Sequence, residues 1–184
     1  MRTSAFNLLN LFLILILSTT HSFADGWEID EMDKYVVLSK HGEVIHGDKL
    51  RFGLERSNCE DIHPFFSFLT TKGKGDIFQL ERQKLPITLN EAELTAYVVL
   101  IKSFANNYGH WVIFSLGKYD LKKYSNLLHN YYLESEKYEI TLRNGLNFEA
   151  KDYFDILKNN WKLENFNKNI LKAYDICKNI SSKS

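Results

Sequence analysis

The chain contains two cysteines, Cys59 and Cys177. In an exported protein, two cysteines with none left over predict one disulfide bond. The bond would close a loop of about 118 residues, and a loop of that length stabilises a fold by about 5 kcal/mol at most in the chain-entropy model. The fold must then bring residues from the first third of the chain next to its C-terminal end. Two unpaired buried thiols are the alternative interpretation.

Export is predicted by the first 24 residues, which have the layout of a secretory signal peptide. A positive start is followed by the apolar run Leu8–Leu17, and Ser22 and Ala24 are the small residues that a signal peptidase reads. The apolar run is about half of the roughly 20 residues that span a bilayer, so a retained membrane anchor is the weaker interpretation. We expect a signal peptide over residues 1–24 and a single β-rich globular domain over residues 25–184, periplasmic or secreted.

The charge balance gives no indication of a charged partner. The chain has 23 Lys and Arg residues and 23 Asp and Glu residues, and the two signs alternate along the sequence. Because nucleic-acid-binding proteins concentrate basic charge, we expect no nucleic-acid partner. The many Lys, Asn, Ile and Tyr residues are typical of a low-GC bacterial source.

Most of the chain predicts β-strands. In Lys49–Ser57 apolar and polar residues alternate, which is the period of a half-buried strand. Leu94–Phe104 and His110–Leu116 are apolar on both faces, which predicts central strands. Asn144-Gly145 is the preferred sequence of a tight hairpin turn. Further strands are predicted over Tyr35–Lys40, Pro64–Thr71, Asp76–Arg82, Tyr138–Arg143 and Leu146–Ala150.

Two segments have helical spacing instead. Asp120–Asn130 is one, and the other follows Asn165, which can cap a helix whose apolar stripe includes Cys177. The sequence therefore predicts a mainly β fold, either a sandwich or a curled antiparallel sheet. It would carry a short internal helix and a C-terminal helix tied down by the disulfide.

The C-terminal half also has a recognisable order of elements. A strand ending at Leu85–Leu89 (LPITL) is followed by an apolar strand, a helix at Tyr119–Asn130 and a hairpin, and Trp161–Phe166 (WKLENF) opens the last helix. In this order the chain resembles the exported bacterial proteins related to invasion-associated locus B. Cysteines in that family tend to pair locally, whereas those of this chain are far apart. The resemblance implies an exported β-rich domain without known catalysis.

One short segment contains residue types that bind metals. His41, Glu43 and His46 could converge on a hairpin as an imidazole and carboxylate site. Along one strand, however, His41 and Glu43 share a face and His46 points away. The favoured interpretation is an exposed polar turn, and we expect no metal and no other cofactor.

Two further groups could support catalysis. Ser115 and His110 are five residues apart on a predicted strand, with no distinctive acid to complete a triad. Glu134, Glu136 and Glu139 could supply the carboxylate pair of a glycosidase. We interpret the first pair as an ordinary strand end and the glutamates as a solvated surface.

Aromatic residues are the remaining functional indication, because they make up 14% of the chain. Tyr108, Trp111, Tyr131 and Tyr132 are near predicted loops or element ends, where such residues often anchor a protein partner. Tyr131 and Tyr132 cannot both face inward if their segment is extended. Arg56, beside Cys59, could bind a ligand carboxylate, or it could pair with Glu60 or Asp61 in a structural role.

The sequence thus predicts an exported, non-enzymatic protein-binding domain, with host interaction or virulence as its setting. The predicted partner is another protein, and no stable membrane anchor is expected. One alternative is a periplasmic inhibitor or immunity protein that blocks a toxin or cell-wall hydrolase. The other is an unrecognised hydrolase that uses His63, His110 or the histidines of residues 41–46.

Overall fold

The predicted signal peptide and its cleavage position after Ala24 lie outside the part of the chain whose structure is described, apart from His21 and Ser22. The computed structural model describes residues 21–22, 26–44, 46–72, 76–104, 108–135 and 137–181.

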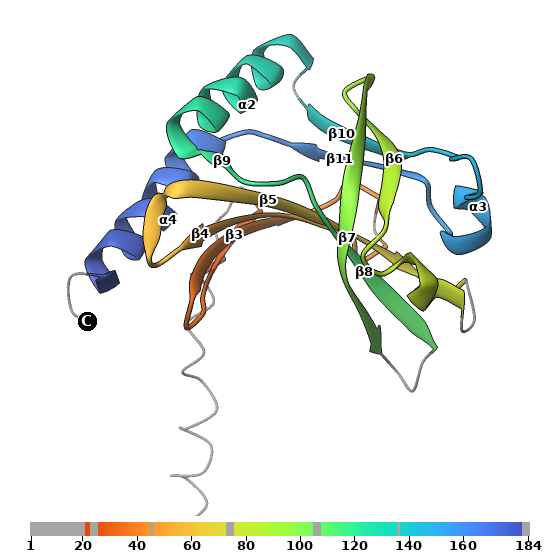
Figure 1. Cartoon of the computed structure of the whole chain (residues 1–184). Coiled ribbons are helices and arrows are strands. Elements are labelled where there is room, and N and C mark those ends of the chain that lie inside the picture. The colour runs from red at the N-terminus through yellow and green to blue at the C-terminus, as the bar shows by residue number, and fades with distance from the viewer. Residues whose placement is uncertain are drawn as a thin grey trace, which may run out of the picture.

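The strands within these residues form one antiparallel β-sheet (Figure 1). β1 to β5 lie side by side in sequence order, and β8, β7 and β6 continue the sheet in reverse order. A short strand, β9 (Tyr119–Asp120), pairs with the first part of β5. From one edge to the other the strands are β1 (His21–Ser22), β2 (Trp27–Glu31), β3 (Tyr35–His41), β4 (Lys49–Glu55), β5 (Asn58–Thr70), β8 (Gly109–Ser115), β7 (Ala92–Phe104), β6 (Lys84–Leu89), β10 (Lys137–Leu142) and β11 (Lys158–Lys162).

The sheet curls until its last strand meets the segment that follows β3. The backbone N–H of Glu43 donates to the carbonyl of Asn160 at 2.9 Å. The buried side chain of Asn159 donates to the Asp48 carboxylate at 2.8 Å and accepts from the backbone N–H of Val44 at 3.1 Å. Asp48 is also buried, and burial raises the pKa of its carboxyl group. These contacts join β11, at one edge of the sheet, to the connection between β3 and β4.

Two long helices cover the inner face of the sheet (Figure 1). α2 (Leu121–Ser135) packs on β5 and β10, and α4 (Phe166–Ser181) packs on β3, β4 and β5. Asp120 accepts a hydrogen bond from the backbone N–H of Lys123 at 2.8 Å and so caps the start of α2. Two shorter elements, η2 (Asp76–Leu80) and α3 (Ala150–Tyr153), lie in connections between strands.

An aromatic cluster joins both helices to the sheet. The ring of Phe52 on β4 lies 4.8 Å from that of Phe166 on α4, 6.1 Å from Trp27 on β2 and 6.3 Å from Tyr124 on α2. Trp27 also donates its indole N–H to the carbonyl of Glu164 at 2.8 Å. Because Phe52 touches three elements, it is central to the packing between sheet and helices.

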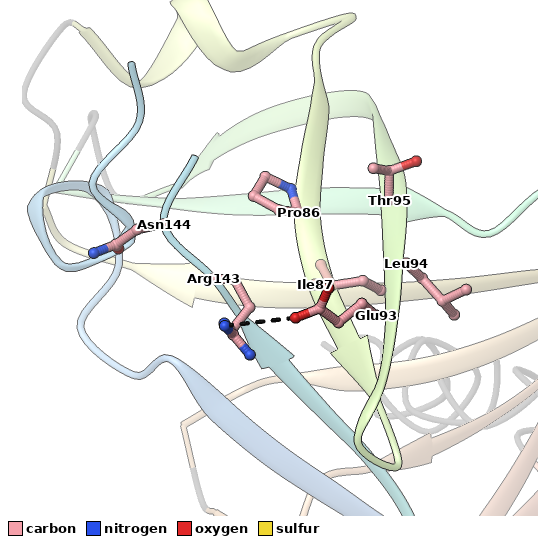
Figure 2. Close-up of a pocket in the computed structure, with 7 residues that line it drawn as sticks. All are labelled: Pro86, Ile87, Glu93, Leu94, Thr95, Arg143 and Asn144. Carbon is pink, nitrogen blue, oxygen red and sulfur yellow. Dashed lines mark ion pairs between the residues drawn. The ribbon is translucent and has the colours of Figure 1, made fainter. Parts of the chain in front are cut away.

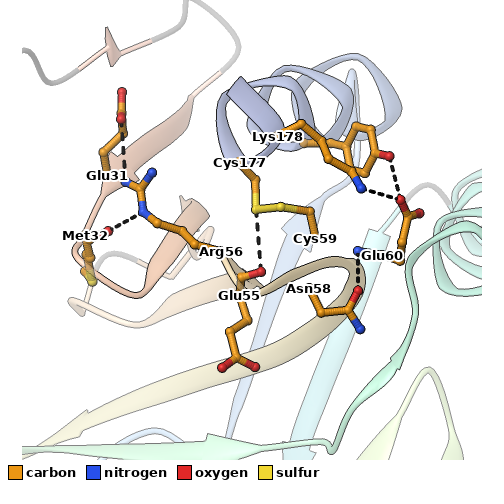
Figure 3. The surroundings of a disulfide bond; sticks show 10 residues. Glu31, Met32, Glu55, Arg56, Asn58, Cys59, Glu60, Cys177 and Lys178 are labelled. Carbon is orange, nitrogen blue, oxygen red and sulfur yellow. Dashed lines mark hydrogen bonds and ion pairs between the residues drawn. A yellow bond between two sulfur atoms is a disulfide. The ribbon is translucent and has the colours of Figure 1, made fainter. Parts of the chain in front are cut away.

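The predicted disulfide between Cys59 and Cys177 is present and links the start of β5 to α4 (Figure 3). Polar contacts between Glu60 and α4 lie beside the disulfide. The Glu60 carboxylate accepts a hydrogen bond from the Tyr174 hydroxyl at 2.7 Å and pairs with the Lys178 ammonium at 2.8 Å. The prediction of a mainly β fold with an internal helix and a disulfide-linked C-terminal helix is confirmed.

One predicted strand is wrong. The sequence predicts a strand over Asp76–Arg82, but Asp76–Leu80 forms the 3₁₀ helix η2. Ile77 and Leu80 are buried while Phe78 between them is 45% exposed. Buried apolar residues three positions apart match the three-residue turn of a 3₁₀ helix. The segment is so short that its residues also fit the alternating pattern of a strand.

The predicted hairpin around Asn144-Gly145 is also wrong. β10 pairs with β11 instead, and Leu146–Ala150 forms only one isolated bridge, between Gly145 and Phe148. The Asn144 side chain accepts the backbone N–H of Ala150 at 3.0 Å and donates to Glu149 at 2.7 Å. It therefore holds the start of α3 rather than a two-residue turn.

Alkaline pH should loosen the contact between α2 and β10. The hydroxyls of Tyr124 and Tyr138 are buried and 3.0 Å apart, and burial raises the pKa of both above the ordinary value of about 10. The folded state disfavours ionisation of these two hydroxyls. Their contribution to folding stability is therefore fully present below about pH 10 and is lost as the pH rises above that value. We expect Tyr138→Phe to unfold at higher pH than the wild type in an alkaline titration followed by circular dichroism. Equal midpoints would contradict the expectation.

Candidate functional site

The outer surface of β7 and β8 carries apolar side chains that nothing in the described part of the chain fully covers. In antiparallel pairs, residues directly opposite each other share a face of the sheet. Tyr97 lies opposite Ser115 on this face, and Leu100 lies opposite Ile113. Tyr97 is 39% exposed and Leu100 is 45% exposed. We call this surface the outer β7–β8 face and define it as Tyr97, Leu100, Phe104, Trp111 and Ile113.

Two aromatic rings form the end of this face nearest the β7–β8 connection. The rings of Phe104 and Trp111 lie 4.6 Å apart. Phe104 lies over Gly109, where a Cβ atom would overlap the ring. Glycine is therefore required at position 109 for Phe104 to pack flat against the sheet.

A β-bulge increases the apolar exposure. The register shifts between Val98 and Leu100, so Val99 is an extra residue with no opposite partner on β8. Val99 is 37% exposed, whereas Val98 is buried in the core. The bulge thus adds a third apolar side chain beside Tyr97 and Leu100.

Two lysines border the outer β7–β8 face. Lys84 lies opposite Tyr97, and Lys102 lies opposite Trp111. Both are exposed, and neither forms an ion pair with a described residue. The next cation across the sheet, Arg51, donates to the hydroxyl of Ser67 at 2.9 Å.

Three acidic side chains on the outer side of the sheet lie beside cations. Glu28 pairs with Lys49 at 2.7 Å, and Asp61 pairs with Lys118 at 2.7 Å. Glu93, near the start of β7, lies 3.8 Å from the guanidinium of Arg143. The centre of the outer β7–β8 face therefore combines apolar side chains with unneutralised positive charge.

The structure places one predicted anchor residue, Trp111, at this face. Tyr108 is 72% exposed and precedes the first residue of β8, outside the defined face. Their binding role stays a prediction.

The other predicted aromatic anchors lie elsewhere. Tyr131 is partly buried against the core on α2. Tyr132 is on the same helix, and its side chain lies outside what the structure describes. The segment is helical rather than extended, so the argument that one of them must face outward does not apply.

Arg56 lies next to the disulfide and contacts β2 and the turn after it (Figure 3). Its Nε donates to the carbonyl of Met32 at 2.8 Å, and its guanidinium is 3.6 Å from the Glu31 carboxylate. Glu31 is thus one ion-pair partner of Arg56.

The residues considered for a metal site have separate neighbours. His41 lies 3.9 Å from Glu28, and burial lowers the pKa of its imidazole. Glu43 instead pairs with Lys162 at 3.5 Å. Within the described ranges, no three His, Cys, Asp or Glu side chains are grouped as metal ligands.

The residues considered for catalysis also lie apart. His110 contacts the Ser103 hydroxyl at 3.1 Å, while the Ser115 hydroxyl accepts the backbone N–H of Gly117 at 3.1 Å. Glu139 pairs with two lysines, which lowers the pKa of its carboxyl group. His63 stacks on Phe65, 6.3 Å away, and burial lowers the pKa of its imidazole.

Two grooves lie outside the outer β7–β8 face, and β7 residues next to that face border the first of them. The first, of about 500 Å³, contains the exposed pair Arg143 and Glu93 (Figure 2). Such an exposed pair is weak, so this groove offers an anion only one loosely held guanidinium. The second, of about 390 Å³, lies between α2 and α4 and is lined by Leu121, Ile170 and Tyr174 among others.

Residues 52–172 match the family model described as baculovirus occlusion-derived virus envelope protein EC27. The match covers about two thirds of the chain. The chain belongs to this EC27 family. No curated protein and no solved structure gives a significant match.

Membership of the EC27 family corrects three predictions. The resemblance to the locus B proteins is wrong, because the matching family is viral. It depended on an order of elements that includes a hairpin which does not form. The expected bacterial source and periplasmic location are wrong for the same reason. A composition rich in Lys, Asn and Ile is not confined to bacteria and so does not identify the source.

The described residues contain no helix that is both long enough and apolar enough to cross a membrane.

Proposed function

We propose that this chain is a non-enzymatic component of a viral envelope, and that it binds there through the outer β7–β8 face. The face carries the proposal, because a central strand with exposed Tyr97, Val99 and Leu100 is unusual for a protein that meets only water. An antiparallel sheet that faces water normally presents polar residues on that side.

The family description supports the location. The EC27 family is described by its place in the envelope of occlusion-derived virus. A signal peptide over residues 1–24, which remains a prediction, would bring the chain to the membranes of the secretory route. The face could meet one of two surfaces. One is another envelope protein, which is the kind of partner that the aromatic content predicts, and the other is the lipid of the envelope.

Fractionation of virions tests the proposal. Tagged wild-type chain should be recovered with the envelope proteins when virions are separated by non-ionic detergent into envelope and nucleocapsid. Tyr97→Ser combined with Leu100→Ser should lower its recovery in the envelope several-fold. Leu171→Ser is the matched control, because Leu171 is 61% exposed on α4, away from the face. Recovery with nucleocapsids, or equal recovery of the face variant and the control, would overturn the proposal.

A further inference from the structure

We infer that the outer β7–β8 face binds the surface of an anionic lipid bilayer. The inference rests on the proposed function and names the partner of the same surface. It combines the apolar exposure of the face, its bordering lysines and its position on the molecule.

The apolar part of the face suits the boundary between headgroups and acyl chains. Leu100 and Val99 are aliphatic, and Tyr97 and Trp111 have rings with a polar tip. Such rings favour a membrane interface, where the apolar body leaves water while the polar tip stays hydrated. All four side chains come from β7 or β8.

The charged part of the face selects the lipid headgroup. Lys84 and Lys102 flank the apolar centre, and their long stems allow the ammonium groups to reach phosphates while the stems cover apolar surface. Outside the centre of the face, Glu28 pairs with Lys49, Asp61 pairs with Lys118, and Glu93 has only a weak exposed pair with Arg143. A surface with negative headgroups therefore meets two positive charges and no free negative charge in the centre of the face.

The shape of the molecule leaves this face accessible. α2 and α4 pack on β3, β4, β5 and β10 and lie away from β7 and β8, so neither helix covers the outer side of these two strands (Figure 1). A broad surface can approach the face without displacing an element of the fold. A bilayer supplies both the apolar layer and the negative charge in one such surface.

Co-sedimentation with vesicles tests the inference. The disulfide-intact full chain is mixed with phosphatidylcholine vesicles that contain or lack phosphatidylserine. We expect tighter binding to the vesicles with phosphatidylserine. Lys84→Gln combined with Lys102→Gln should weaken that binding by about thirtyfold, which corresponds to about 1 kcal/mol for each lysine. Leu100→Ser should weaken it as well.

Matched controls come from the helices. Lys122→Gln combined with Lys123→Gln removes two exposed charges from α2, and Leu171→Ser removes an exposed leucine from α4. These variants should bind like the wild type. All variants share the apolar N-terminal segment, so any binding by that segment is common to every sample.

Two results would overturn the inference: no preference for phosphatidylserine, or equal losses in the face variants and the helix controls. If vesicle binding fails while envelope recovery still depends on Tyr97 and Leu100, the partner is another protein and the proposed function stands. If envelope recovery is also independent of these residues, both proposals fail.

Discussion

Removing the disulfide by Cys59→Ala combined with Cys177→Ala should lower the free energy of unfolding by about 2–5 kcal/mol. The bond joins residues separated by 118 positions, so it restricts most of the unfolded chain. Both cysteines are buried, and α4 keeps the buried residues Ile170 and Ala173 for packing without the bond. The variant should therefore fold, with a melting temperature lower by about 2–4 °C for each kcal/mol lost.

Urea denaturation of the oxidised wild type, the reduced wild type and the variant measures this effect. The reduced wild type controls for the missing sulfur atoms, because it lacks the crosslink but keeps both side chains. Its unfolding midpoint should lie close to that of the variant. Equal midpoints for the oxidised and reduced wild type would show that the bond contributes nothing to stability.

The second large effect is expected from Phe52→Ala, which should lower the free energy of unfolding by about 3–5 kcal/mol. Phe52 is fully buried, and its ring contacts Trp27, Tyr124 and Phe166. Truncation leaves a cavity where β4 meets both long helices. The surrounding elements are tied to one another, so they can only partly collapse into it.

Two further variants isolate the cause of that loss. Phe52→Leu refills most of the volume and should cost less than about 1.5 kcal/mol. Phe78→Ala removes the same atoms from a side chain that is 45% exposed, and such surface changes usually stay within about 0.5 kcal/mol. Tryptophan fluorescence during urea unfolding reports all three, since Trp27 lies against Phe52. A similar loss for Phe78→Ala and Phe52→Ala would rule out cavity formation as the cause.

Local sequence patterns predict the strands and helices whose buried side chains repeat at regular spacing within the element itself. β4 alternates apolar and polar residues, and its Leu50, Phe52 and Leu54 are all buried. α4 repeats apolar residues at helical spacing, and its stripe places Cys177 inside. β2 (Trp27–Glu31) has the same alternation but is short and follows the predicted cleavage position, so no strand was predicted there.

Elements fixed by distant contacts could not be predicted in this way. The partner of β10 is β11, which follows 16 residues after β10 through α3 rather than two residues after it. The choice depends on Asn144 holding the start of α3 and on β11 meeting residues 43–48. Neither contact leaves a periodic signal in the sequence.

The candidate site was predicted only in part for a related reason. Aromatic character near a loop indicates Trp111, but the apolar run that contains Tyr97 and Leu100 predicts a buried central strand. A continuous apolar run is typical of a strand covered on both faces. β7 is central in the sheet, yet only its inner face, with Ala96 and Val98, is covered. Which face remains open depends on where the helices pack.

The meeting of β11 with residues 43–48 has a consequence for the order of folding. Asn159 contacts Val44 and Asp48 across 115 and 111 positions of sequence. Such distant contacts are slow to form, because much of the chain must be ordered before they can. During synthesis, β3 and β4 emerge long before β11 and α4 are available. The inner side of β4, with Leu50 and Leu54, therefore stays exposed until the last residues arrive, and this interval is when the nascent chain is most prone to aggregation.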